Sequence, residues 1–287
     1  MVGALSAWAG GPWLESGNRG DVVEIATELE ELGYTRLWLS AGFGDGVPSI
    51  FGELLAATTR LQVASGILSI WHAGPQQAAD AVAELERAHP GRFLLGLGVS
   101  HAPLVESSGE AYRRPYSRMV SYLDDLDAAS PPVPPERQVL AALGPRMLEL
   151  SGQRAVGAHP YFVPVEHTVQ AREQLGSGVL LAPEVAVVLE PDAATARAVA
   201  RRYMDGYLQL PNYTSTLRRL GWSEEDLSGG GSDALVDALV PWGTTERVAA
   251  RVAEHHAAGA DEVAVQVLTA SGALPRDEFA ELAHLLL

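Results

Sequence analysis

The sequence predicts an α/β protein folded as a single (β/α)8 TIM barrel that spans residues 1–287. Apolar, strand-like runs alternate along the chain with longer stretches of helical period, an order that is typical of a parallel sheet covered by helices. These runs give eight strands, and 287 residues are enough for one barrel of this kind. Apolar residues make up 47% of the chain, which is enough to fill a large core.

The first half of the chain supplies four strands, expected at residues 3–9, 36–40, 61–70 and 92–98. Helices are expected at 21–32, 49–59, 75–88 and 114–129. In the first of these helices, Val22, Ile25 and Leu29 lie on one face. Asp21 precedes that face as an N-cap residue, and Gly33 ends the helix. Residues 130–135 are rich in proline, cannot be helical and are expected to connect the two halves.

The second half supplies the other four strands, expected at 138–142, 158–163, within 179–189, and at 262–268. One helix begins at Gly144-Pro145, because proline suits the first helical turn. Further helices are expected at 165–175, 192–208, 244–258 and 277–287. We predict an irregular insertion at 211–241, which includes three consecutive glycines at 229–231. Such a segment in a barrel often serves as a lid or an oligomer contact.

Charge and composition exclude several classes of function. The net charge is −16 and the basic residues are scattered, which argues against nucleic-acid binding. All 20 basic residues are arginine, so Schiff-base chemistry and the lysine-dependent phosphate loop are excluded. The chain has no cysteine, and zinc-type histidine spacing is missing, so no metal is expected. Without a membrane-length apolar run or a signal peptide, we expect a cytoplasmic protein.

The candidate functional residues lie at the ends of the predicted strands. The active site of a barrel lies on the face where its strands end. Gly66 interrupts the third strand, which indicates either a close backbone approach or simple barrel curvature. Gly96 and Gly98 end the fourth strand, where glycine lets a planar ligand approach the backbone. Ser100 and His101 follow, and His101 is either a structural residue or a proton-transfer group.

Two more strand ends suggest ligand contacts. Leu143 and Gly144 open a helix, where free N–H groups and the helix dipole can hold phosphate, and Arg146 would add a charge-assisted contact. An ordinary turn between strand and helix is the alternative. His159 follows the sixth strand and either faces a cofactor or bonds a loop carbonyl. The chain lacks the Gly-x-Ser-x-Gly elbow of hydrolases and the full dinucleotide fingerprint, so both of those classes are disfavoured.

These segments resemble the luciferase-like flavin and deazaflavin enzymes, which are TIM barrels. The matching residues are Gly66-Ile67, the run from Gly91 to Gly98, and residues 141–145. Segments 137–150, 159–176, 210–213 and 231–233 resemble one subfamily described as coenzyme F420-dependent oxidoreductases. The resemblance covers nearly the whole chain.

The resemblance implies a role for each matching residue. Gly66–Ile67 would form the non-proline cis peptide that backs the deazaflavin ring in relatives. Leu143 and Gly144 would offer backbone N–H groups to the cofactor phosphate. His101 falls where a relative has a catalytic glutamate, so it is the expected catalytic proton donor or acceptor. The expected cofactor-binding residues are Ser40, Gly66, Ile67, Gly98, Ser100, His101, Leu143, Gly144, Arg146 and His159.

One departure from the family concerns the end of the second strand. Relatives often carry an acidic residue or Asp-His there, whereas this chain has Ala41 and Gly42. The chemistry would then fall to His101, or to groups on the substrate side of the site. The residues expected to contact substrate are Trp8, Trp13, Trp71 and His72.

The leading hypothesis is therefore a coenzyme F420-dependent oxidoreductase that transfers a hydride between F420 and a small organic substrate. An FMN-dependent luciferase-like monooxygenase on the same fold is the first alternative. A non-catalytic barrel that binds a ligand without turnover is the second. The expected partners are a small-molecule substrate and, by analogy with relatives, a second copy in a homodimer. Neither nucleic acid nor a membrane is expected.

Overall fold

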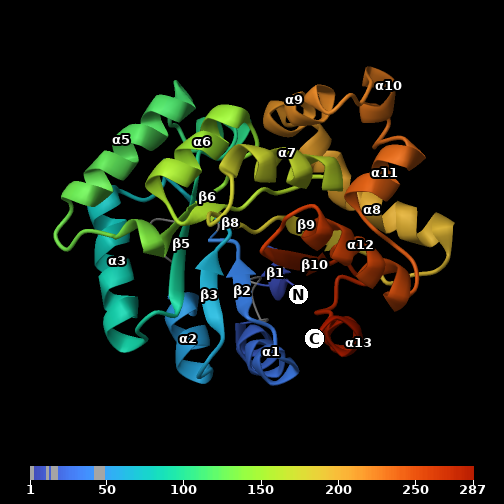
Figure 1. The fold of residues 1–287 in the computed structure, drawn as a ribbon, viewed down its shortest axis with the longest axis horizontal. Helices are drawn as coiled ribbons and strands as arrows, with labels where there is room; N and C mark the ends of the chain where they lie inside the picture. The colour runs from blue at the N-terminus through green and yellow to red at the C-terminus, as the bar shows by residue number, and fades with distance from the viewer. Residues whose placement is uncertain (1–2, 11–12, 14–18, 42–48) are drawn as a thin grey trace.

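In the computed structural model, parallel strands form a curled sheet with helices around it (Figure 1). The structure describes residues 3–10, 13, 19–41 and 49–287. The strands are β1 (Ala4–Ala9), β2 (Arg36–Leu39), β3 (Gln62–Ser65), β4 (Leu68–Ser69), β5 (Phe93–Gly98), β6 (Gln138–Leu140), β7 (Gly157–Ala158), β8 (Leu180–Leu181), β9 (Glu184–Val187) and β10 (Glu262–Val267). The helices are α1 (Arg19–Leu32), α2 (Ile50–Ala57), α3 (Pro75–Ala88), α4 (Ala102–Ser107), α5 (Pro115–Ala128), α6 (Pro145–Arg154), α7 (Val165–Leu175), α8 (Ala193–Leu208), α9 (Pro211–Arg219), α10 (Glu224–Leu227), α11 (Asp233–Leu239), α12 (Thr245–Ala257) and α13 (Arg276–Leu286), with a 3-10 turn at Pro135–Arg137.

The sheet follows the strand order β8-β7-β6-β5-β3-β2-β1-β10-β9, and neighbouring strands are parallel. Its two ends, β8 and β9, are consecutive in sequence. On the β7 side, Ala182 N donates to Ala158 O at 3.0 Å, and on the β10 side, Asp261 N donates to Leu181 O at 2.9 Å. Residues 180–187 therefore hold both ends of the curled sheet. The predicted α/β fold with a parallel sheet is confirmed.

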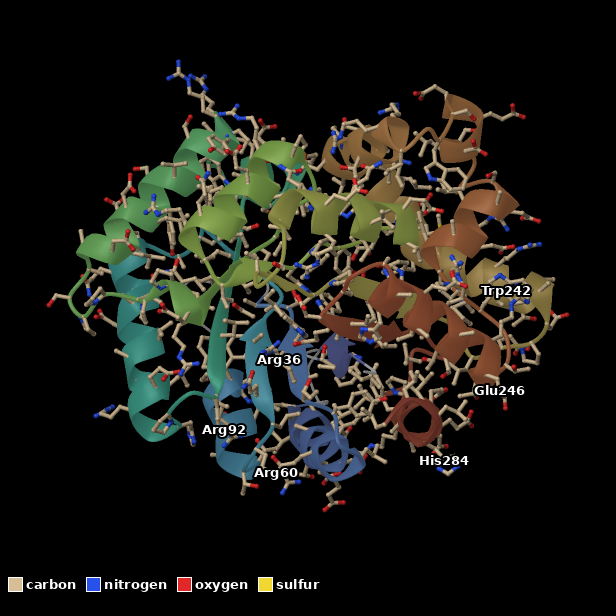
Figure 2. The ribbon with its side chains drawn as sticks, viewed as in Figure 1. Arg36, Arg60, Arg92, Trp242, Glu246 and His284 are labelled. Atoms are coloured by element: carbon tan, nitrogen blue, oxygen red, sulfur yellow. The ribbon has the colours of Figure 1, made fainter. Side chains whose placement is uncertain are left out.

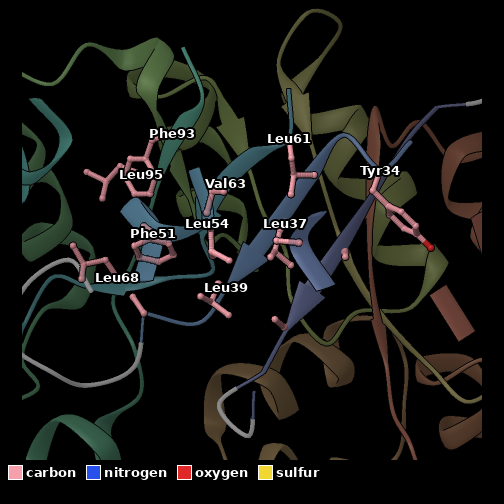
Figure 3. Close-up of a cluster of buried hydrophobic side chains, with 14 of the residues drawn as sticks. Tyr34, Leu37, Leu39, Phe51, Leu54, Leu61, Val63, Leu68, Phe93 and Leu95 are labelled. Atoms are coloured by element: carbon pink, nitrogen blue, oxygen red, sulfur yellow. The ribbon is translucent and has the colours of Figure 1, made fainter. Parts of the chain in front are cut away.

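Alternate strand residues face two different cores. Leu37 and Val63 belong to a large cluster that includes Phe51 of α2 and lies between the sheet and its helices (Figure 3). Their neighbours in sequence, Trp38 and Ala64, belong to a separate cluster inside the curl. This alternation follows from the two-residue period of a strand. The sheet is therefore packed on both faces.

Charged residues occupy the amino-terminal end of the strands. Arg36 pairs with Glu262, and Trp38 Nε1 donates to the same carboxylate at 2.7 Å. Arg92, beside α2 in Figure 2, donates to the carbonyl oxygen of Thr58 at 2.8 Å. These polar contacts bind the strands to one another and to α2 at this end. The opposite, carboxyl-terminal end of the strands is left for a ligand.

The third predicted strand, 61–70, is two short strands in the structure. β3 ends at Ser65 and β4 begins at Leu68, and the peptide bond between Gly66 and Ile67 is cis, as the family resemblance implied. β4 then pairs with β5. The strand expected at 158–163 is also shorter, because Pro160 has no N–H to donate to a neighbouring strand.

The prediction of an irregular segment at 211–241 is wrong, because this segment forms α9, α10 and α11. Pro211 occupies the first turn of α9, where proline is favoured. Ser223 and Asp226 form a capping box on α10, and Ser232 caps α11. The three glycines at 229–231 form only the turn between α10 and α11. Sequence analysis also missed α4, which lies directly after β5.

The helices range from the four-residue α10 to the 16-residue α8. Within the described part of the chain, none combines the length and the apolar composition needed to cross a membrane. In Figure 1, α8 to α11 lie together at one side of the molecule, next to α7 and α12. Tyr213 and Leu217 of α9 share one buried cluster with Ala186 of β9, so these late helices pack onto the sheet.

Candidate functional site

A cavity of about 640 Å³ lies at the carboxyl-terminal ends of the strands. Its lining comes from the ends of β1 to β7 and from α4 to α6, α8 and α9. The structure brings together around it all ten residues expected to bind the cofactor, namely Ser40, Gly66, Ile67, Gly98, Ser100, His101, Leu143, Gly144, Arg146 and His159. Sequence segments more than 100 residues apart therefore meet at one place, as expected for a parallel sheet.

The floor of the cavity is made of backbone and small side chains. A Cβ on Gly98 would lie 2.6 Å from Ile67 Cδ1, and one on Gly66 would lie 2.7 Å from Trp8 Nε1. At Gly96, two residues before Gly98 in β5, a Cβ would lie 1.9 Å from the Ser65 carbonyl oxygen. A Cβ at any of these three positions would force a neighbouring atom to shift, so glycine at Gly66 and Gly98 leaves space above this part of the floor. Such a surface can lie against a flat ring system.

His101 stands beside this floor. Ser100 adopts a left-handed conformation, with φ of 53°, and its carbonyl accepts a hydrogen bond from Asn212 Nδ2 at 3.2 Å. This turn places His101 at the N-cap of α4, with its ring 5.0 Å from the ring of Tyr213. Burial lowers the pKa of His101 to about 4. At neutral pH its imidazole is therefore uncharged and able to accept a proton from a bound hydroxyl group.

A second feature of the cavity is the amino terminus of α6. Gly144 is the N-cap residue, and no side chain caps the helix there. A Cβ on Gly144 would meet no atom closer than Arg219 Nη2 at 3.7 Å, so the surrounding protein leaves space in front of it. Arg146 lies beside this end, with its guanidinium 4.0 Å from the centre of the Tyr116 ring. Two arginines and a helix terminus form the positive end of the cavity.

His159 bonds a loop carbonyl, which is one of the two alternatives that the sequence left open. It is almost fully buried, and its Nδ1 lies 2.6 Å from the Ala182 carbonyl oxygen, to which it donates. Its ring stacks on Trp38 at 3.8 Å, and burial lowers its pKa to about 4. It also lines the cavity. His159 is thus a neutral ring that bonds a carbonyl and borders the space for a ligand.

Of the four residues expected to contact substrate, only Trp8 lines the cavity. Trp13 packs in the large outer core, 6.0 Å from the ring of Phe279. Trp71 donates from Nε1 to the Val99 carbonyl at 2.8 Å and thereby supports the wall from behind. His72 is a partner of Ser108 near α4. Of the two residues that replace the acidic group of relatives, Ala41 is buried in the core, and Gly42 lies outside the described residues.

Sequence analysis missed an aromatic wall made by three tyrosines. Tyr161 follows β7, Tyr207 lies on α8 and Tyr213 lies on α9, and all three line the cavity. The Oη atoms of Tyr161 and Tyr207 are 2.9 Å apart, and Tyr161 Oη donates to Gln266 Oε1 at 2.9 Å. No local spacing in the sequence relates these three residues, because they come from three different segments.

The residues present fit a flat cofactor that carries a phosphate. The glycine floor suits a ring, and the uncapped end of α6 with Arg146 and Arg219 suits an anion. The Nδ1 atom of His101 is buried, and within the described residues it has no hydrogen-bond partner. The same residues contain no cluster of three or more histidine, aspartate or glutamate side chains that could hold a metal.

The sequence of this chain is similar to a known protein family. The family model described as luciferase-like monooxygenase matches residues 1–262. A protein of Mycobacterium tuberculosis named as a coenzyme F420-dependent oxidoreductase is 23% identical over 195 residues. That alignment covers 65% of this chain and 50% of the relative, so the chain spans about half the length of that protein.

Solved structures with similar folds differ in the cofactor that they use. An F420-dependent secondary alcohol dehydrogenase, in complex with an F420-acetone adduct, has a TM-score of 0.73 and 13% identity, covering 100% of this chain and 98% of that one. The oxygenating constituent of a 3,6-diketocamphane monooxygenase from Pseudomonas putida, in complex with FMN, has a TM-score of 0.72 and 12% identity, covering 100% and 97%. At these identities the likeness shows the fold alone.

Proposed function

The chain belongs to the luciferase-like monooxygenase family, and we propose that it is a coenzyme F420-dependent oxidoreductase acting on a small organic substrate. The observation that carries this proposal is the continuous cavity that joins the glycine floor to the positive end at α6. A deazaflavin with a phosphate-bearing tail needs both parts. The name of the M. tuberculosis relative, a putative coenzyme F420-dependent oxidoreductase, is in line with this cofactor.

Each part of the cavity has a role in this proposal. The floor at Gly66, Ile67 and Gly98 would hold the ring, and the N–H groups at Leu143 and Gly144 would hold the phosphate. Bound there, the cofactor supplies hydride chemistry. The uncharged His101 accepts the proton of a substrate hydroxyl when an alcohol is oxidised. The aromatic wall excludes water from the space above the floor.

Titration of the protein with F420, followed by quenching of the cofactor fluorescence, tests the proposal. We expect a Kd of about micromolar size. Replacing both Arg146 and Arg219 with alanine should weaken binding by roughly 100-fold or more, because charge-assisted contacts contribute about 1.5–3 kcal/mol each. Arg154→Ala is the matched control. It lies at the far end of the same helix, where Arg154 pairs with Asp127 at 2.9 Å, and should leave the Kd unchanged.

The other outcomes of this titration identify the alternatives. Tight binding of FMN without binding of F420 would indicate an FMN-dependent monooxygenase, which oxygen consumption with reduced flavin would then test. Absence of binding by either cofactor would favour a barrel that binds a ligand without turnover. Equal weakening by Arg154→Ala and by the double variant would contradict the placement of the phosphate at α6.

A further inference from the structure

The tyrosine wall continues into another aromatic ring at each of its ends. Within the wall, the ring centres of Tyr161 and Tyr207 are 5.3 Å apart, and those of Tyr207 and Tyr213 are 5.4 Å apart. Trp8 follows at one end, 5.0 Å from Tyr161, and His101 follows at the other, 5.0 Å from Tyr213. These separations are typical of aromatic rings in contact. The five rings all line the cavity, so they form one continuous surface, which we call the aromatic arc.

Both ends of the aromatic arc lie at the glycine floor. Trp8 packs against Gly66, where an added Cβ would be 2.7 Å from Trp8 Nε1. His101 follows Gly98 closely in the chain and is the N-cap residue of α4. The arc and the floor therefore border the same space, and the flat cofactor is expected on the floor. A substrate that reacts with this cofactor has to lie between it and the arc.

Two hydroxyl groups of the wall are engaged within the protein. Tyr161 Oη donates to Gln266 Oε1 at 2.9 Å and lies 2.9 Å from Tyr207 Oη. A phenol has one proton to donate, so the bond between the two tyrosines is donated by Tyr207. Neither hydroxyl group has a proton left for a ligand. What these two residues offer to a ligand is therefore mainly the surface of their rings.

The charges of the cavity disfavour a cationic ligand. Among the residues that the structure describes, no aspartate or glutamate belongs to the lining, whereas Arg146 and Arg219 do. Glu184 is buried, accepts a hydrogen bond from Phe162 N at 3.1 Å and is not part of the lining. A cage for an ammonium ion also needs rings that face one another across the ion, whereas the rings of the arc touch each other. The space beside the arc therefore suits an uncharged ligand.

We propose that the substrate is an uncharged alcohol or carbonyl compound with an aromatic ring, and that this ring packs on Tyr161, Tyr207 and Tyr213. This inference rests on the proposed oxidoreductase function, to which it adds the class of substrate. A ring on this surface gains contacts with the faces and edges of the tyrosines, and it loses little conformational freedom because it is rigid. The three tyrosines are then specificity-determining residues that recognise the substrate through their rings.

The substrate class can be tested by NMR titration of three probes with the protein in the absence of cofactor. Benzyl alcohol represents the proposed class, cyclohexylmethanol replaces its flat ring by a puckered one without π electrons, and benzyltrimethylammonium carries a positive charge. We expect benzyl alcohol to bind about three- to tenfold more tightly than cyclohexylmethanol, and also more tightly than the cation. Equal affinities for the two alcohols, tighter binding of the cation, or no binding of benzyl alcohol would overturn the inference.

Variants of the wall show whether its rings recognise the probe. Tyr207→Leu and Tyr213→Leu should each raise the Kd for benzyl alcohol about three- to tenfold, because leucine is apolar but has no ring. Tyr207→Phe keeps the ring and should keep the Kd. If one leucine variant fails to fold, the other still measures the effect. An unchanged Kd in the leucine variants, or a loss in Tyr207→Phe as large as theirs, would contradict recognition by the rings.

Tyr34→Leu is the matched control for these substitutions. Tyr34 is 3% exposed in the outer core, and its Oη donates to the Phe279 carbonyl oxygen at 2.9 Å. Its replacement should lower the melting temperature and leave the Kd for benzyl alcohol unchanged, because Tyr34 does not line the cavity. A rise in Kd equal to that of the wall variants would show that they act through stability alone and would overturn the inference.

The probe titration needs no cofactor, so this inference and the proposed function fail separately. If benzyl alcohol binds to the wall and F420 does not bind, the choice of cofactor is wrong and the ligand class stands. If F420 binds and benzyl alcohol does not, the substrate class alone is wrong.

Discussion

Gly98 shows how single residues set the shape of the site. It lies where β5 ends, between Ile67 on one side and Ala141 on the other. A Cβ there would lie 2.6 Å from Ile67 Cδ1 and 3.3 Å from Ala141 Cβ, which is too close for both neighbours to stay in place. Because Ile67 forms part of the floor, any displacement of its side chain enters the space proposed for the ring.

Gly98→Ala should therefore lower both stability and ligand binding. Overpacking of this kind costs about 1–3 kcal/mol in the free energy of unfolding, and the displaced Ile67 should weaken F420 binding as well. Denaturant melts and the fluorescence titration measure the two effects. Gly206→Ala in α8 is the control, because its Cβ would meet no atom within 4 Å and alanine favours a helix by up to about 1 kcal/mol. Equal stability of the two variants would contradict the packing argument.

Residue by residue, the sequence predicted the backbone of the site better than its walls. Glycine inside an apolar strand and glycine before a helical proline are local signals, so the positions of Gly66, Gly98 and Gly144 could be predicted. The tyrosine wall is a different case, because it joins side chains from the segment after β7, from α8 and from α9 that no local spacing relates. The prediction that Trp13 contacts substrate is wrong, because an aromatic residue near a strand end can equally pack into the outer core, as Trp13 does.

At the scale of elements, a single carboxylate of α1 binds the segment that leads into β3. Glu30 accepts hydrogen bonds from the backbone N–H groups of Thr59, Arg60 and Leu61 at 2.5 to 3.1 Å. Burial alone would raise the pKa of Glu30, but these backbone bonds outweigh it and lower the pKa to about 2. The connection between α2 and β3 therefore depends on a charged side chain from α1.

Glu30→Gln should lower the free energy of unfolding at pH 7 by about 1–2 kcal/mol, a value kept small because the group is partly exposed. The folded-state pKa lies below the ordinary value of 4.5, so this contribution is present above pH 4.5 and disappears as the pH falls towards 2. Urea melts of both proteins from pH 2 to pH 7 measure it. Glu31→Gln, at the next position of α1, should change stability by less than about 0.5 kcal/mol. A difference between Glu30→Gln and wild type that stays constant with pH would contradict the assignment.

The elements also show where sequence patterns mislead. Strongly periodic helices such as α1, α3 and α8 were predicted within two residues of their ends. At 211–241 the glycine run suggested irregular structure, whereas the serine caps and Pro211 support three short helices. Short helices carry little periodic signal, so their caps are the more informative feature.

For the whole molecule, the match of the family model to residues 1–262 identifies the family, and the fold does not determine the cofactor. F420-dependent and FMN-dependent enzymes both share this fold at similar TM-scores. The cavity of this chain is lined by an arginine pair at one end, an uncharged histidine beside the floor, and a wall of three tyrosines. The choice of cofactor therefore depends on the contacts that these side chains make with a ligand. The strand order does not determine those contacts.

A crystal structure of the protein with F420 tests the account most directly. We predict that the deazaflavin ring lies on Gly66, Ile67 and Gly98, that the phosphate lies at Gly144 within reach of Arg146 and Arg219, and that His101 faces the ring. A ring bound outside this cavity, or a phosphate placed away from the end of α6, would contradict the account.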